Sequence, residues 1–271
     1  MGHVEWVQFG RVEHVPRAGE VVHARDCFAE PAGGGGVAAA QLAALAGEAL
    51  LMTALGEDDE GRRSAARLGE LGVRVCAAQR DAPTRGALTL IDAAGQRTIT
   101  TLGERLQPEG ADAELPWQEL AEMDAVYFTA GDLEALRAAR GARVLVASPR
   151  AREALGHSVA LDALVLSADD PIERGELARA QGEAELILTT EGERGGSYRS
   201  VGGASGRWAP APPPAEPVDS YGCGDAFAAG LTYALGAGMA TSEALTLAAQ
   251  CGAVCLTGRG PYGRLLTLDA A

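Results

Sequence analysis

The feature that most constrains the fold is a stretch near the C-terminal end, residues 219–230, which reads Asp-Ser-Tyr-Gly-Cys-Gly-Asp-Ala-Phe-Ala-Ala-Gly. Gly222 and Gly224 flank Cys223, and small and apolar residues then recur at helical spacing. Glycines at these positions let the backbone adopt positive φ values and approach a ligand closely. The stretch therefore predicts a tight turn that leads into a buried helix.

Asp225 stands in the first turn of this predicted helix, and two interpretations of it stay open. An acid at a helix start caps free amides and complements the helix dipole, which is a structural role. The amides of residues 222–225 also point together at such a start, where they bind anions. A carboxylate beside an anion site is what phosphoryl transfer to an alcohol requires, because it accepts the hydroxyl proton while the amides stabilise the phosphate charge.

Composition limits the classes of partner. The formal net charge is −14, the isoelectric point is near 4.7 and every basic residue is Arg, which argues against nucleic acid or a membrane surface as partner. No apolar run approaches the roughly 18–20 residues of a membrane span, and no targeting pattern begins the sequence, so we expect a cytoplasmic protein. The 5 cysteines are odd in number and lack Cys-x-x-Cys spacing, which favours reduced thiols.

Predicted strands and helices alternate along most of the chain. Strands are expected at residues 4–9, 21–28, 49–54, 73–77, 125–129, 143–147, 163–167 and 185–190. The later strands are continuous Val, Leu and Ile runs, which are typical of buried parallel strands. This alternation predicts an α/β fold in which one domain, residues 1–271, carries helices on the faces of a mostly parallel sheet.

Residues 86–102 follow a different pattern, with alternating Thr on both sides of a predicted turn at 92–95. Such alternation predicts a hairpin in a partly exposed sheet. We expect this hairpin and residues 12–29 to form a small sheet that acts as a lid; the alternative is a hairpin on the edge of the main sheet. Exposed strands in such a lid also favour pairing with a second copy, as a homodimer.

The motif Asp-Ser/Thr-x-Gly-x-Gly-Asp-x-Phe-x-x-Gly is complete from Asp219 to Gly230 and resembles the C-terminal signature of the ribokinase-type carbohydrate kinases, the PfkB family. The resemblance extends to residues 33–38 and 56–61 and covers essentially the whole chain. It implies a ribokinase-like three-layer sandwich and an ATP-dependent kinase that uses Mg²⁺ and phosphorylates a hydroxyl of a small sugar or sugar-like substrate. It also implies that Asp225 is the catalytic base and that the amides of Gly222, Cys223 and Gly224 form the anion hole.

The same resemblance assigns further residues to the substrate, the nucleotide and metal ions. Substrate residues are Gly34, Gly35, Gly36 and Ala38, to which we add Glu5 on the first strand; nucleotide residues are Thr190, Gly192, Gly195 and Gly224. Asp170 corresponds to an acid linked to magnesium, although it equally suits the start of the next helix. Asp219 and the backbone at Tyr221 correspond to positions that hold a monovalent cation such as K⁺.

Departures from the family pattern concern the substrate. Ala38 stands where the family usually has a sugar-binding Asn, Val7 where ribokinases place an Asp, and Ser167 where a phosphate-linked Asn is usual. We therefore expect ribose to be a poor substrate, and a nucleoside, or a sugar acid met by an arginine of the lid, to suit the site better. The alternative is a kinase-fold binding or regulatory protein without efficient turnover. An NAD-dependent enzyme is a third hypothesis, but the glycine run at 33–36 lacks the Gly-x-Gly-x-x-Gly spacing.

Overall fold

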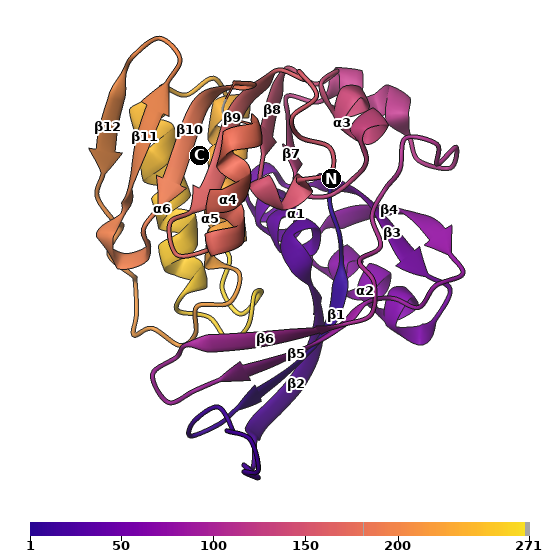
Figure 1. Ribbon diagram of the computed structural model, residues 1–271, viewed down its shortest axis with the longest axis vertical. Helices are drawn as coiled ribbons and strands as arrows, with labels where there is room; N and C mark the ends of the chain where they lie inside the picture. Colours follow the sequence, from indigo (N-terminus) through magenta and orange to yellow (C-terminus); the bar gives the residue numbers. More distant parts are fainter. Residues whose placement is uncertain (181, 269–271) are drawn as a thin grey trace.

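The structure, a computed structural model, describes residues 1–180 and 182–268, so the last residues of the predicted domain lie outside the described part. Its main sheet has the strand order β12-β11-β10-β9-β8-β7 (Figure 1). The strands are β7 (Ala125–Phe128), β8 (Val144–Ala147), β9 (Leu161–Ser167), β10 (Ala184–Thr190), β11 (Gly196–Ser200) and β12 (Ser205–Trp208). Strands β7 to β10 are parallel, as predicted, whereas β11 and β12 are antiparallel additions whose Gly- and Ser-rich segments give no strand pattern in the sequence.

Helices cover both faces of this sheet, because successive strand residues point to opposite sides and both sides are apolar. One face packs against α1 (Gly33–Ala46), α5 (Cys223–Gly236) and α6 (Thr241–Cys255), with Tyr127, Val146 and Leu188 in that core. The other face packs against α3 (Leu133–Ala139) and α4 (Pro171–Ala180), with Phe128, Leu145 and Leu164 in that core. The predicted three-layer α/β sandwich is confirmed.

A second, two-stranded parallel sheet lies beside the first. It consists of β3 (Ala49–Gly56) and β4 (Val73–Arg80), joined by α2 (Asp59–Glu70). Residues 1 and 2 connect the two sheets, since the Thr129 amide donates to the Met1 carbonyl (3.1 Å) and the Gly2 amide donates to the Met52 carbonyl (3.2 Å). In the described part of the chain, no helix is both long enough and apolar enough to span a membrane.

A four-stranded sheet projects from this body as a lid (Figure 1). Its order is β2 (Arg25–Ala32), β1 (Glu5–Arg11), β5 (Gly86–Ile91) and β6 (Arg97–Leu102). The predicted lid is therefore confirmed and the alternative of a main-sheet edge hairpin is wrong, but β1 belongs to the lid and residues 12–24 form no strand. Every residue of the edge strand β6 is exposed, and its pairing with a second copy stays a prediction.

The glycine run that begins α1 allows the start of the chain to cross directly over the helix. The Gly35 amide donates to the His3 carbonyl (3.1 Å), and a Cβ added at Gly35 would lie 2.6 Å from the Gly2 carbonyl carbon. Gly33 adopts a φ of +82°, which favours glycine. These glycines bring α1, the chain start and β7 into close contact.

We expect Gly35→Ala to lower the free energy of unfolding by about 1–3 kcal/mol, because backbone atoms on both sides cannot move aside for the new methyl group. Gly69→Ala on α2 is the matched control: a Cβ there meets no atom within 4 Å, and Ala in a helix interior stabilises by about 0.5–1 kcal/mol. Urea unfolding of both variants measures the difference. A Gly35→Ala variant as stable as Gly69→Ala would contradict the close crossing.

Candidate functional site

A buried turn at residues 219–222 precedes α5 and fixes the position of its first residues. Asp219 is 2% exposed, and its carboxylate accepts the amides of Tyr221 (3.0 Å) and Gly260 (2.9 Å). Gly222 follows with a φ of +83°, and a Cβ there would lie 3.0 Å from Val37 and 3.2 Å from Pro261. Both the backbone conformation and the space therefore require glycine before the helix begins.

The start of α5 has no side-chain cap and lies next to free space at Gly224. The N-cap residue is Gly222, which has no side chain to cap the first amides. Gly224 is exposed, and a Cβ added there meets no atom within 4 Å. An uncapped helix start beside free space is suited to an anion, because its amides and the helix dipole carry partial positive charge.

Asp225 lies in the first turn of α5 and faces the first turn of α1. A Cβ added at Gly34 would lie 3.1 Å from Asp225 Oδ1, so the two helix starts meet at this carboxylate. Burial raises the pKa of Asp225, and the positive charges of Arg150 and Arg97 act in the opposite direction. The group is a carboxylate with raised basicity at an uncapped helix start, which is the combination that a general base for an alcohol needs.

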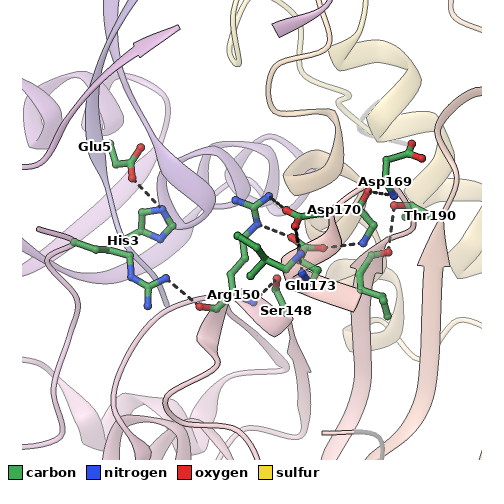
Figure 2. Close-up of polar contacts among 12 residues, drawn as sticks. His3, Glu5, Ser148, Arg150, Asp169, Asp170, Glu173 and Thr190 are labelled. Atoms are coloured by element: carbon green, nitrogen blue, oxygen red, sulfur yellow. Dashed lines mark hydrogen bonds and ion pairs between the residues drawn. The ribbon is translucent and has the colours of Figure 1, made fainter. Parts of the chain in front are cut away.

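Arg150, which the sequence analysis did not single out, lies between the two halves of the site (Figure 2). Its Nε donates to Glu173 Oε1 (2.6 Å) and its Nη2 lies 3.3 Å from Asp170 Oδ2. Although burial opposes its charge, the carboxylates of Asp225 and Glu173 together raise the pKa of Arg150. Arg150 follows the parallel strand β8, at the carboxyl ends of the strands, where α/β proteins bind ligands. That position is the signal that could have identified it.

On the other side of Arg150, His3 and Glu5 lie together at the start of β1 (Figure 2). Their Nε2 and Oε1 atoms are 3.6 Å apart, and Arg85 Nη1 is 3.1 Å from the same Glu5 oxygen. Burial raises the pKa of Glu5, whereas burial and the charges of Arg105, Arg150 and Arg85 lower the pKa of His3 to about 3. His3 is therefore a neutral ring at pH 7, and the contact of Glu5 with the substrate stays a prediction.

The other predicted substrate residues differ in position. Gly34 faces Asp225, whereas Gly35 packs on the chain start and Gly36 faces Val4 and Tyr262. Ala38 of α1 is 2% exposed, because its side chain lies in the core between this helix and the main sheet. It therefore presents no surface to a ligand.

The predicted nucleotide turn follows β10. Thr190 Oγ1 donates to the Leu166 carbonyl (3.3 Å), and Gly192 is exposed with a φ of +57°. Gly195 is buried instead, since a Cβ there would lie 2.2 Å from the Trp208 carbonyl oxygen. Thr190 and Gly192 thus lie at the carboxyl end of β10, whereas Gly195 packs against the backbone at Trp208.

Neither predicted metal position has a carboxylate oxygen left without a partner. Asp170 Oδ1 accepts the amides of Ile172 (2.9 Å) and Glu173 (3.2 Å) at the start of α4, and Oδ2 faces Arg150. Asp219 holds two amides, with Arg11 Nη2 3.9 Å from Oδ2. In the described part of the chain, no cluster of three His, Cys, Asp or Glu side chains is placed to hold a metal ion. The carboxylates of Asp170 and Asp219 are thus already engaged within the protein, and their assignment to Mg²⁺ and K⁺ stays a prediction.

The chain is similar in sequence to a family of known proteins and in structure to several solved proteins. The model of the pfkB family of carbohydrate kinases matches residues 2–151 and 151–267. A ribokinase from Thermotoga maritima has a similar structure, with a TM-score of 0.78, 18% identity and coverage of 98% of this chain and 94% of that one. The Arabidopsis thaliana ribokinase solved with ribose and ATP has a TM-score of 0.74 and 19% identity, with coverage of 97% of this chain and 94% of that one. The Burkholderia thailandensis nucleoside kinase solved with inosine has a TM-score of 0.73 and 18% identity, with coverage of 98% of this chain and 92% of that one. No curated protein matches the sequence.

We expect Asp225→Asn to raise the free energy of unfolding at pH 7, because it removes a carboxylate whose charged form is disfavoured by burial. A pKa raised by folding means that the folded protein binds this proton more tightly than the unfolded chain does. The carboxylate therefore destabilises the fold above its folded pKa, and this effect disappears below the ordinary value of 3.8.

Urea unfolding at pH 7 and at the lowest pH where the protein stays folded measures this difference. The control is Asp81→Asn, which changes an exposed carboxylate. If Asp225→Asn were no more stable than Asp81→Asn at pH 7, burial would not govern the Asp225 carboxylate.

Proposed function

Because the chain belongs to the pfkB family of carbohydrate kinases, we propose that it transfers the γ-phosphoryl group of ATP to a hydroxyl of a small sugar-like acceptor, with Asp225 as the base. The observation that carries this proposal is the uncapped start of α5, where the first amides lack a side-chain cap and Asp225 lies in the same helical turn. Together they provide the two functions that phosphoryl transfer to an alcohol needs.

Asp225 accepts the acceptor's hydroxyl proton as the oxygen forms its bond to the γ-phosphorus. The bond between that phosphorus and the bridging oxygen of ADP breaks, and the products are ADP, the phosphorylated acceptor and a proton that Asp225 later releases to water. Burial supports this role, since it raises the pKa of the carboxylate towards the working pH. Gly34 lets the start of α1 approach this carboxylate closely, since a Cβ there would lie 3.1 Å from Oδ1.

The amides of residues 222–225 stabilise the charge that spreads over the phosphoryl oxygens during transfer. Arg97 of β6 supports this part of the site from the lid, because its Nη1 donates to the Ser220 carbonyl (2.8 Å) and hydroxyl (3.1 Å) just before the turn. The lid thus reaches the residues that precede the anion hole, and its closure over them excludes water from the reaction.

For the nucleotide we propose a site between the Thr190–Gly195 turn and α6. Support comes from the exposed Gly192 after the carboxyl end of β10 and from the Arabidopsis ribokinase, whose structure is a complex with ribose and ATP. When bound, Mg²⁺ neutralises phosphate charge. We assign it to the nucleotide rather than to Asp170, whose oxygens are already used, and we derive no step through Mg²⁺ or K⁺.

A binding or regulatory protein without efficient turnover is the second candidate. One observation favours it: Asp170, expected beside the phosphates, is engaged by the start of α4 and by Arg150. ATP consumption in the presence of a cognate acceptor separates the two candidates.

We expect Asp225→Asn to lower turnover of the best acceptor by at least about 10²-fold, the usual scale for a general base, while ATP affinity stays within threefold. The measurement pairs steady-state kinetics with nucleotide titration, and Asp81→Asn is the control. Turnover within threefold of the wild type would exclude Asp225 as the base.

A further inference from the structure

Four arginines lie around Asp225 and Glu5 although the protein as a whole is strongly acidic. The formal net charge is −14. Arg85 stands just before β5, Arg97 lies in β6, Arg105 follows β6 and Arg150 follows β8. A positive cluster in an acidic protein attracts anions to one place on its surface.

Two of these guanidinium groups have carboxylate partners and two do not. Arg85 pairs with Glu5, and Arg150 pairs with Glu173 and Asp170. Arg105 donates to the Arg150 carbonyl (3.0 Å) and to Gln107 Oε1 (3.2 Å). In residues 1–180 and 182–268, no ion pair with a carboxylate is found for Arg105 or Arg97.

The surroundings of Arg105 disfavour its positive charge. The group is half-buried, and burial together with the charges of Arg85 and Arg152 lowers its pKa, with Glu153 and Glu5 acting in the opposite direction. A partly buried cation without an anionic partner is costly, and a bound anion lowers that cost. The position of Arg105 is therefore suited to a ligand that brings the missing negative charge.

Two buried polar atoms next to this cluster also lack partners. They are Arg85 Nε and His3 Nδ1, and His3 is 6% exposed. Buried groups of this kind are almost always hydrogen-bonded in a complete site. They add hydrogen-bonding capacity beside Arg105, as a polyhydroxylated ligand requires.

The cluster lies on the acceptor side rather than the nucleotide side. His3 and Glu5, which feel the charges of Arg85 and Arg105, are on one side of Arg150, whereas Thr190 is on the other (Figure 2). We propose, on the basis of the proposed kinase function, that the acceptor is a small polyhydroxylated anion, a sugar acid or a sugar phosphate, whose anionic group binds Arg105 with Arg85 beside it. A carboxylate and a phosphate group each match the planar fork of donors on a guanidinium group.

The test uses matched pairs of ligands: aldonic and 2-keto sugar acids and sugar monophosphates, each beside its neutral parent sugar. Calorimetry without nucleotide measures binding, and kcat/KM at saturating ATP measures transfer. We expect the anionic member of the best pair to bind at least about tenfold more tightly. The acid and phosphate pairs show which anion the site takes.

Arg105→Gln should weaken binding of that anion by about 10- to 100-fold, the range for a charge-assisted hydrogen bond, and change binding of the neutral parent less than threefold. Arg62→Gln, an exposed arginine on α2, is the matched control. The KM for ATP should stay within twofold in both variants.

Tighter binding of neutral sugars, or a raised KM for ATP with unchanged acceptor binding in Arg105→Gln, would overturn the inference. Efficient phosphorylation of a neutral sugar would do so while leaving the proposed kinase function intact. Arg105-dependent anion binding without any phosphoryl transfer would support the inference and contradict the kinase function.

Discussion

The uncapped start of α5 is the element on which the rest of the site depends. Its amides stay free because Gly222, not a capping side chain, precedes the helix, and because the buried Asp219 carboxylate holds the turn through the amides of Tyr221 and Gly260. The same turn directs Asp225 towards α1, where Gly34 leaves room for it. The proposed anion site and the proposed base are therefore products of one local structure.

Segments far apart in the sequence complete this centre. The lid reaches it through Arg97 on the Ser220 backbone, and β8 delivers Arg150 from the main sheet. Arg150 links the two sides of the site electrostatically, since its charge acts on both His3 and Asp225. The proposed acceptor side, the Asp225 carboxylate and the start of α5 are thus linked through the charge of Arg150.

The sequence predicted the parts that depend on local pattern. The motif at residues 219–230 placed Asp225 and the glycines correctly at a helix start, and apolar runs predicted β7 to β10. What it could not predict depends on distant contacts: the pairing of Arg150 with Glu173, the crossing of the chain start over α1 and the burial of Ala38. A charged residue after a strand has no sequence signature until the fold shows what surrounds it.

The most direct test of the central role of the α5 amides is the turnover of Gly224→Val. A side chain at Gly224 enters open space in the free protein and so leaves the fold intact, but it occupies the place where the phosphoryl group would contact the amides. With Gly69→Val as the control for a valine in a helix, we expect kcat to fall about 10²- to 10³-fold at an unchanged unfolding midpoint. Kinetics within threefold of the wild type would contradict the account.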